Sequence, residues 1–303
     1  MVNANAGRAR RDSGLVGRLR ALLGEENVRL TRCAQDLGPA LDALRDAGIG
    51  RLVLVGGDGT VGGTLTALLA RWPGAELPSV LLTAGGTVNT IAKSMGSAGA
   101  PDAVLRRVLD NGPRELSPRP LIEVRTPDGR QRSGMIFANG VAVRWLRMYY
   151  EDSSRGVPGA GSTVARIMAS AAVRGALARR LFAAAHARIV VDGELLARQR
   201  FTVMAAASCA HIGLGFAPFH LAGKHPERFH FAVSEARAAR IVAEMPSVRL
   251  GVKRRNSCIE DHAARRVDLA FDEPQPWSID ADVYPPVREL SLRATPPLRF
   301  VVP

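Results

Sequence analysis

In the first third of the chain, short runs of aliphatic and β-branched residues alternate with longer segments of helical periodicity. The short runs predict strands at residues 28–31, 52–55 and 80–83. The longer segments predict helices at residues 37–47, 64–72 and 102–110. Strands and helices that alternate at this spacing are typical of a parallel sheet with crossover helices, in which ligands bind at the carboxyl ends of the strands.

The pattern changes beyond residue 111, and residues 117–120 (Ser-Pro-Arg-Pro) are typical of a linker. Further strands are predicted at residues 121–126, 135–143, 187–191, 195–206, 229–233, 267–271 and 289–293. Asp128-Gly129 and Asp192-Gly193 lie between such runs and predict hairpin turns. Helical patterns at 163–185 and 235–244 interrupt the strands. This part of the chain is therefore expected to be an antiparallel β domain with inserted helices.

The composition narrows the class of protein. A chain of 303 residues with 47% hydrophobic residues can fill real cores, which excludes intrinsic disorder and a small disulfide scaffold. The net charge of +13 favours anionic partners, although drift in composition explains it about equally well. The basic residues are scattered and not interleaved with aromatic residues, so we expect no nucleic-acid partner. With no signal peptide and no bilayer-spanning run, a cytoplasmic protein, soluble or peripheral to the membrane, is expected.

The strongest chemical signal is a glycine-rich loop that follows the predicted strand at 52–55. Its sequence is Gly56-Gly57-Asp58-Gly59-Thr60, and it leads into a predicted helix. Glycines let backbone N–H groups approach an anion closely, and the N-terminus of a helix adds to the attraction. Asp58 would repel phosphate, so it is interpreted as a ligand of Mg²⁺ or as a group that handles a proton.

A second glycine loop follows the next predicted strand. It contains Gly86-Thr87-Val88-Asn89 and also leads into a helix. Lys93-Ser94 imitates the end of a Walker A motif, but the glycines of that motif are missing. Two such loops at neighbouring strand ends predict that a nucleotide is clasped between them.

These two loops resemble the catalytic domain of diacylglycerol kinases, a family that includes sphingosine kinases and bacterial lipid kinases. The opening residues 3–7 (Asn-Ala-Asn-Ala-Gly) resemble the family's first-strand signature, and Thr31 falls where the family has a threonine. Residues 212–218 and 277–282 resemble segments of its second domain. The resemblance implies an α/β fold: a Rossmann-like nucleotide domain at 1–118, completed by about 294–303, and an antiparallel β-sandwich lipid domain at 119–293.

The resemblance also implies a function, that of an ATP-dependent lipid kinase of bacterial phospholipid biosynthesis. Asp58 would support Mg-ATP, and Asp280 would act as general base toward a lipid hydroxyl. Asp58 and Asp282 are the candidate Mg²⁺ ligands. The candidate nucleotide-binding residues are Asn3, Gly7, Thr31, Gly56, Gly57, Gly59, Thr60, Gly86, Thr87 and Asn89.

Several positions depart from the family pattern. Thr90 stands in place of an aspartate, Gly63 in place of a glutamate, and Asp282 in place of the glutamate of Asp-Gly-Glu. Asp192-Gly193-Glu194 spells that motif but is assigned to a hairpin turn. The first strand is almost absent, which leaves open whether the natural chain starts upstream. These departures leave open one alternative to a lipid kinase, a catalytically degenerate member that binds nucleotide or lipid at a membrane. A second alternative is an NAD kinase, since that family also uses Gly-Gly-Asp-Gly-Thr.

The expected partner is a lipid at an anionic membrane surface, toward which basic residues attract the protein. The helix at 164–185 could lie at that surface, but its arginines spread around the helix, which favours a scaffold role. A homodimer is left open. The five histidines between positions 186 and 230 share no ligand spacing and receive no role.

Overall fold

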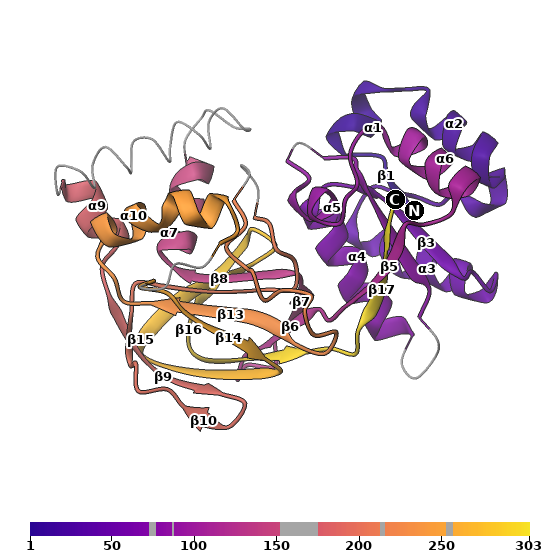
Figure 1. Cartoon of the computed structure of the whole chain (residues 1–303). Helices are drawn as coiled ribbons and strands as arrows, with labels where there is room; N and C mark the ends of the chain where they lie inside the picture. Colours follow the sequence, from indigo (N-terminus) through magenta and orange to yellow (C-terminus); the bar gives the residue numbers. More distant parts are fainter. Residues whose placement is uncertain (73–76, 87, 152–174, 213–215, 253–256) are drawn as a thin grey trace. The chain divides into compact units, whose positions relative to one another are not determined.

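The computed structural model describes residues 1–72, 77–86, 88–151, 175–212, 216–252 and 257–303. The chain divides into two compact units, shown in Figure 1. The N-terminal unit consists of Met1–Arg119 together with Leu298–Pro303. The C-terminal unit consists of Pro120–Pro297.

The N-terminal unit is built on a mixed six-stranded sheet in the order β2-β1-β3-β4-β17-β5. Its strands are β1 (Val2–Asn3), β2 (Leu30–Thr31), β3 (Arg51–Gly56), β4 (Ser79–Ala84), β5 (Glu115–Arg119) and β17 (Leu298–Val302). Neighbouring strands are parallel except for the pair of β5 and β17, which is antiparallel. The predicted Rossmann-like class of this unit is therefore confirmed.

Helices cover both faces of this sheet. They are α1 (Gly7–Arg11), α2 (Leu15–Leu23), α3 (Leu37–Asp46), α4 (Asp58–Arg71), α5 (Thr90–Ser94) and α6 (Pro101–Asn111). Val55 and Leu81 belong to the same buried core as residues of α2 and α6. Leu54 and Leu82 point to the opposite face, because successive side chains of a strand alternate, and both are fully buried. α3 and α4 pack against each other away from α2 and α6 (Figure 1).

Two sequence predictions for this unit need correction, and two helices were missed. α4 begins at Asp58 instead of residue 64, so the first glycine loop passes directly into the helix. α1 and α2 were not predicted. Residues 117–120 are not a linker, since Glu115–Arg119 forms the edge strand β5. An edge strand tolerates Pro118 because one side of the strand needs no hydrogen-bond donors.

The C-terminal unit is an antiparallel β structure. Its strands are β6 (Ile122–Arg125), β7 (Gln131–Gly134), β8 (Ile136–Gly140), β9 (Ala185–Val191), β10 (Glu194–Leu195), β11 (Arg200–Phe201), β12 (Val203–Ala207), β13 (Phe229–Ser234), β14 (Glu260–Ala264), β15 (Arg266–Ile279) and β16 (Asp282–Ala294). They form one hydrogen-bonded sheet of 11 strands, joined by the long β15. Val267–Phe271 of β15 pair with β9, and Trp277–Ile279 pair with β8.

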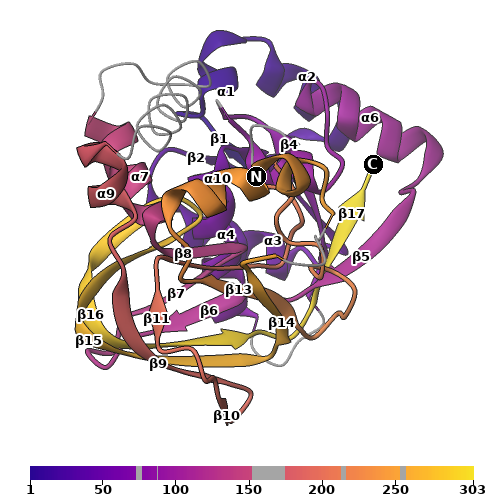
Figure 2. The same ribbon diagram turned by 60° about the vertical axis from the view of Figure 1, so that its left-hand side comes forward.

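Helices lie on one side of this sheet. They are α7 (Val141–Glu151), α9 (Ala176–Leu181) and α10 (Ala238–Arg249), and Figures 1 and 2 show them on the same side. α7 was not predicted, and most of the helix expected at 163–185 lies outside the described residues. No helix in the described part of the chain is long and apolar enough to cross a bilayer.

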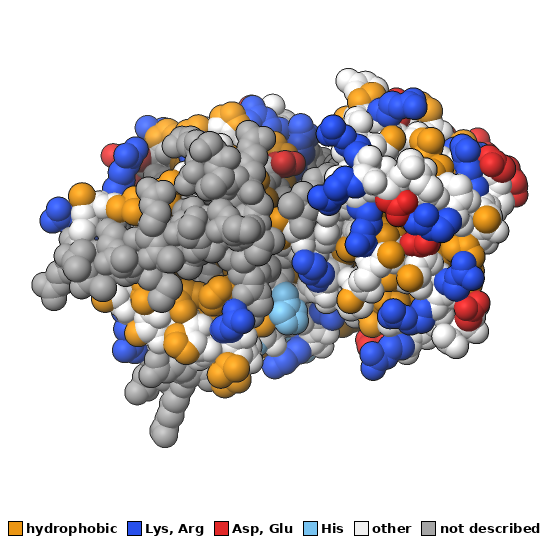
Figure 3. All heavy atoms as spheres, turned by 90° about the horizontal axis from the view of Figure 1, so that it is seen from above, with side chains coloured by type: hydrophobic (Ala, Val, Ile, Leu, Met, Phe, Trp, Pro, Cys, Tyr) orange, Lys and Arg blue, Asp and Glu red, His pale blue; other side chains and the backbone are white. Residues whose placement is uncertain are grey.

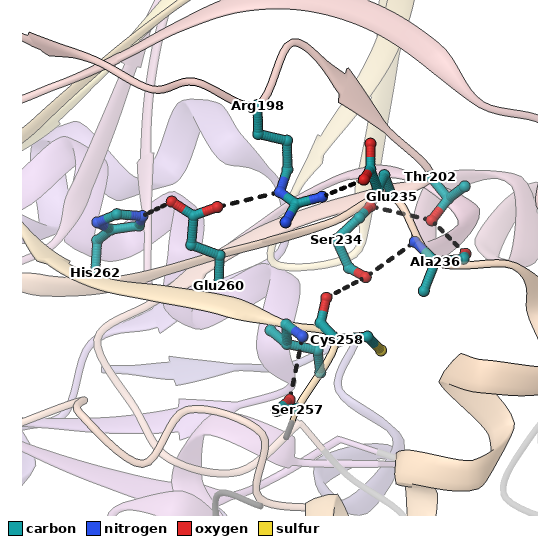
Figure 4. A network of polar contacts seen from close by, with 10 residues as sticks. Arg198, Thr202, Ser234, Glu235, Ala236, Ser257, Cys258, Glu260 and His262 are labelled. Carbon is teal, nitrogen blue, oxygen red and sulfur yellow. Dashed lines mark hydrogen bonds and ion pairs between the residues drawn. The ribbon is translucent and has the colours of Figure 1, made fainter. Parts of the chain in front are cut away.

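A polar network joins Arg198, which lies between β10 and β11, to the end of β13 and to β14 (Figure 4). Arg198 pairs with Glu235 (2.9 Å) and with Glu260 of β14 (3.1 Å). His262 lies 3.0 Å from the same Glu260 carboxylate. At the other end of the network, the Ser234 hydroxyl donates to the carbonyl of Cys258 (2.8 Å). The network fixes the segment after β13 against β14.

Candidate nucleotide-binding edge and acceptor-side carboxylates

The carboxyl ends of four neighbouring parallel strands meet at one edge of the N-terminal sheet. Asn3, Thr31 and Gly56 end β1, β2 and β3, and Ala84 ends β4. The Asn3 side chain donates from Nδ2 to the Thr60 hydroxyl (2.7 Å), which joins the first-strand loop to the start of α4. Most of the candidate nucleotide residues thus lie along this edge.

The two glycine loops are in backbone contact. The N–H of Gly85 donates to the carbonyl of Gly56 (3.0 Å). A Cβ added to Gly86 would lie 2.5 Å from the Gly57 Cα, and one added to Gly85 would lie 2.6 Å from the Gly56 nitrogen. Only glycine permits this approach, since backbone atoms cannot move aside as flexible side chains do.

Asp58 joins the first loop to the helix that follows the second. It is the first residue of α4, and its carboxylate accepts the backbone N–H groups of Thr90 (3.1 Å) and Ile91 (2.9 Å) at the start of α5. A carboxylate at a helix N-terminus satisfies donors that have no partner within the helix. Asp58 therefore fixes the second loop in place, a role that the sequence did not reveal.

Asn89 shapes the second loop from within. Its backbone takes the left-handed conformation (φ 56°), which asparagine tolerates better than most residues. Its side-chain oxygen accepts the N–H of Gly86 (2.6 Å), and its amide donates to the Gly86 carbonyl (2.7 Å). Thr87, the remaining candidate of this loop, lies outside the described residues.

Gly59 and Gly7, the remaining glycines of the predicted nucleotide-binding set, lie in different surroundings. Gly59 is exposed, and a Cβ there would meet no atom within 4 Å, so its space is open to a ligand. Gly7 begins the short helix α1. The next residue, Arg8, donates its backbone N–H to Gly85 (2.9 Å) and its guanidinium to the carbonyl of Gly99 (2.7 Å). Arg8 was missed, and its place directly after the first-strand loop was the available signal.

Cationic side chains surround this edge. Arg10, Arg11, Arg32 and Lys93 are exposed on the segments that follow β1, β2 and β4. Figure 3 shows Lys and Arg side chains spread over the visible face of the N-terminal unit. Such a surface attracts a polyphosphate by long-range electrostatics.

Asp280 lies in the C-terminal unit, at the turn between β15 and β16. Asp280 and Ala281 both have positive φ angles (47° and 74°), which strains the alanine in particular. The Asp280 Oδ1 accepts the N–H groups of Met135 and Ile136, each at 2.9 Å. Its side chain lies against Gly134, where an added Cβ would come within about 2.4 Å of Oδ2. The carboxylate is 6% exposed and held in one orientation.

Asp282 begins β16 on the other side of this turn. It is exposed to solvent, yet partial desolvation raises its pKa, against the opposing effect of the Arg132 charge. The Arg132 guanidinium lies 5.8 Å from the centre of the Tyr284 ring, which stacks on Trp277 at 4.3 Å. Asp280 and Asp282 thus lie on one turn of the C-terminal unit, whereas Asp58 lies in the N-terminal unit.

The fold brings together two of the five histidines to which no role was assigned from the sequence. His220, His230 and Asp261 form a cluster that could hold a metal ion. His230 is fully buried, its Nε2 lies 2.8 Å from Asp261, and its Nδ1 accepts the N–H of Leu221 (3.3 Å). Both ring nitrogens are therefore engaged, and a metal ion would have to displace one of these hydrogen bonds.

One further motif is only partly visible. The segment at 212–218 resembled a part of the second domain, but residues 213–215 lie outside the described residues.

Asp192-Gly193-Glu194 forms the turn between β9 and β10, with φ angles of 50° and 93° at Asp192 and Gly193. Its assignment to a hairpin turn is correct.

Residues 1–118 match the family model described as the diacylglycerol kinase catalytic domain. The N-terminal region is thus similar to that domain family. Two crystal structures from Bacillus anthracis str. Sterne are similar to the whole chain. One, of a protein provisionally designated a diacylglycerol kinase, has a TM-score of 0.69 at 13% identity and covers 100% of this chain and 95% of its own. The other, of a diacylglycerol kinase, has a TM-score of 0.63 at 12% identity, with coverage of 100% and 95%.

At these identities the two structures establish the fold, which is the two-domain architecture of a diacylglycerol kinase. Yeast NADH kinase in complex with NADH has a TM-score of 0.45, too low to support an argument about function. No curated protein sequence matched the chain. The diacylglycerol kinase domain family implies kinase activity, and the acceptor has to be argued from the residues.

Proposed function

We propose that the protein is an ATP-dependent lipid kinase that transfers the γ-phosphate of ATP to a lipid hydroxyl. The observation that carries this proposal is the pair of glycine loops at one sheet edge, held in backbone contact and tied together by Asp58. A diacylglycerol-like or sphingoid lipid is the proposed class of acceptor, since the N-terminal domain matches the diacylglycerol kinase family.

The nucleotide would lie across the two loops. α4 starts at Asp58, so the N–H groups of its first turn lack partners within the helix and are available to phosphate oxygens. Gly59 leaves open space beside them. Asn3 and Thr60 hold the adjoining edge through their hydrogen bond. Phosphoryl transfer depends mainly on positioning and electrostatics, which such a rigid set of donors supplies.

Mg²⁺ is the metal that this chemistry calls for. It is bound in kinases through one or two carboxylates together with substrate phosphates, where it neutralises developing negative charge. Asp58 fits this requirement in part: its oxygens accept two backbone N–H groups and keep lone pairs for a cation or its water shell. Asp282 is the second candidate ligand.

Asp280 is the proposed general base toward the acceptor hydroxyl. Two backbone N–H groups fix its Oδ1, so its orientation does not depend on the substrate. The acceptor would be drawn from an anionic membrane surface, consistent with the net charge of +13.

The alternative is a protein that binds nucleotide or lipid without turnover. One observation favours this alternative: both carboxylate oxygens of Asp58 already accept backbone N–H groups, those of Thr90 and Ile91. An NAD kinase remains the third hypothesis, and it predicts phosphorylation of a soluble acceptor.

The test is transfer of ³²P from labelled ATP with Mg²⁺ to diacylglycerol, sphingoid bases, ceramide and phosphatidylglycerol in mixed micelles, with NAD as the soluble control. We expect one labelled lipid. Asp280→Asn should lower turnover by about 10²–10⁴-fold with ATP binding unchanged, because the amide oxygen still accepts both N–H groups but has no basic carboxylate. Labelled NAD alone would overturn the lipid assignment. ATP binding without any labelled product would favour the non-catalytic alternative.

A further inference from the structure

The C-terminal end of α10 presents apolar side chains in a fixed conformation. The N–H of Val252 donates to the carbonyl of Ser247 (3.0 Å), and the N–H of Gly251 donates to that of Val248 (3.2 Å). With Gly251 at φ 66°, this is a Schellman motif. The motif holds Leu250 and Val252 rigidly on either side of the glycine.

Most of the surface of these two side chains is open to solvent. Leu250 is 77% exposed and Val252 is 61% exposed. In a Schellman motif the residue after the glycine commonly packs back on the last helical turn. Here the residues that it would meet are Ser247 and Pro246, yet Val252 remains 61% exposed. Folding of this unit therefore does not account for two large apolar residues at this position.

Ile212 and Phe216 extend the apolar surface. Ile212 is 43% exposed, and its N–H donates to the carbonyl of Phe216 (3.0 Å). The Arg249 guanidinium lies 5.8 Å from the centre of the Phe216 ring. A hydrogen bond from the N–H of Ala217 to the carbonyl of Val248 (3.0 Å) holds Ala217 beside the end of α10.

The exposed charged residues within α10 itself are both arginines. Arg240 and Arg249 of α10 are exposed, and so is Arg237, which precedes the helix. Glu244, the acidic residue of α10, is 3% exposed and does not face solvent. Apolar side chains flanked by exposed arginines are complementary to a bilayer with anionic headgroups, and an apolar protein partner would not require these charges.

We propose that Leu250, Val252 and Ile212 form a membrane-docking tip, in which the apolar side chains insert into an anionic bilayer and the arginines contact headgroup phosphates. The tip gives the proposed lipid kinase access to its acceptor. The docking proposal depends on the proposed kinase function only for the reason why the protein would bind a membrane. Binding to vesicles does not require turnover.

The experiment is sedimentation of the full chain with vesicles of phosphatidylcholine containing 30% phosphatidylglycerol, a composition chosen as roughly that of an anionic surface. L250E/V252E should lower the vesicle-bound partition coefficient about tenfold or more, since it replaces insertion with charge repulsion. The matched control is L195E, because Leu195 is 54% exposed on β10, away from this tip. L195E should bind as the unchanged protein does. A third variant, R240Q/R249Q, should bind more weakly to anionic vesicles only.

Equal binding of L250E/V252E and L195E would overturn the proposal, provided that both variants have an unchanged circular dichroism spectrum. A change of oligomeric state in L250E/V252E without loss of vesicle binding would assign the surface to self-association and would also overturn it. ATP hydrolysis and phosphorylation of a short-chain, water-soluble acceptor give an independent readout. If these fail in the unchanged protein while its vesicle binding depends on the tip, then the kinase proposal falls and the docking proposal stands.

Discussion

The carboxylate of Asp58 accepts the backbone N–H of Ile91 at 2.9 Å, across 33 positions of sequence. One residue at the start of α4 thereby caps α5 and sets the distance between the two glycine loops. A phosphate bound across both loops meets donors whose spacing is fixed before it arrives, which lowers the cost of binding.

Asp58→Ala removes this cap and should lower the free energy of unfolding by about 1 kcal/mol, as for other lost helix caps. Urea unfolding followed by circular dichroism measures this change. ATP affinity should fall as well, because the second loop loses its attachment. Asp58→Asn keeps one accepting oxygen and should lose less stability. If Asp58→Ala matches the unchanged protein in stability, then the two hydrogen bonds do not hold the loop.

Gly86→Ala and Gly59→Ala form a second pair of variants. The Cβ of Gly86→Ala would lie 2.5 Å from the Gly57 Cα, so the loops must separate, and both stability and ATP binding should fall. The Cβ of Gly59→Ala meets no protein atom within 4 Å. We therefore expect unchanged stability and weaker ATP binding, because the methyl group occupies the space assigned to the ligand.

Calorimetric titration with ATP and Mg²⁺, together with thermal unfolding, distinguishes these two variants. Tight ATP binding by Gly59→Ala would place the nucleotide elsewhere on the sheet edge. Omission of Mg²⁺ from the same titration should weaken binding by the unchanged protein, since the metal offsets repulsion between the phosphates and Asp58.

Arg18 should make the N-terminal unit sensitive to acid. It hydrogen-bonds to Asp12 and Asp102, each at 2.6 Å. The hydrogen bond from Arg18 lowers the pKa of Asp12. Burial alone would raise the pKa of Asp102, but the Arg18 hydrogen bond and charge, with backbone N–H groups, lower it overall.

Groups with a lowered pKa stabilise the fold above their unfolded pKa, which is about 3.9 for aspartate, and lose this contribution as the pH falls further. The urea midpoint should therefore drop as the pH falls below about 4. Arg18→Met should make this fall in the urea midpoint smaller, because the carboxylates of Asp12 and Asp102 lose the guanidinium that they share. An identical pH dependence in both proteins would show that the pair does not contribute.

The sequence was most informative for features that local sequence determines, such as a strand and the loop that follows it. The predicted runs at 52–55 and 80–83 lie within β3 (Arg51–Gly56) and β4 (Ser79–Ala84), and strand ends of parallel neighbours must meet at one edge. The start of α4 was missed because Gly59 and Gly63 weaken helix propensity. Burial of Val61 and Leu65 outweighs that weakness, and burial depends on the tertiary fold.

Contacts between distant segments could not be predicted. The donors to Asp280 are Met135 and Ile136, which lie 145 and 144 positions away in the sequence. His230 meets Asp261 because β13 and β14 pair with Ala232 opposite Asp261, a register that no local pattern specifies. The candidate site residues and the strand ends at which they lie could be predicted from the sequence, whereas their hydrogen-bond partners could not.

Gly134→Ala tests Asp280 without altering it. The new Cβ would lie about 2.4 Å from the Asp280 Oδ2 and 2.6 Å from an Ile279 side-chain carbon, so the carboxylate must shift. Overpacking of this kind should cost about 1–3 kcal/mol of stability. If Asp280 is the base, turnover should fall about 10- to 100-fold, because efficient proton transfer requires hydrogen-bond reach. ATP binding should be unchanged, since Gly134 belongs to the C-terminal unit.

Gly17→Ala is the matched control for Gly134→Ala, because its Cβ meets no atom within 4 Å and it lies in α2. Turnover should be unchanged, and the free energy of unfolding should rise by about 0.5 kcal/mol, since alanine favours a helix more than glycine does. Labelled-phosphate transfer at saturating ATP, with unfolding measured in parallel, separates the two effects. Full turnover by a folded Gly134→Ala variant would remove Asp280 from the reaction, because a displaced carboxylate cannot act as a positioned base.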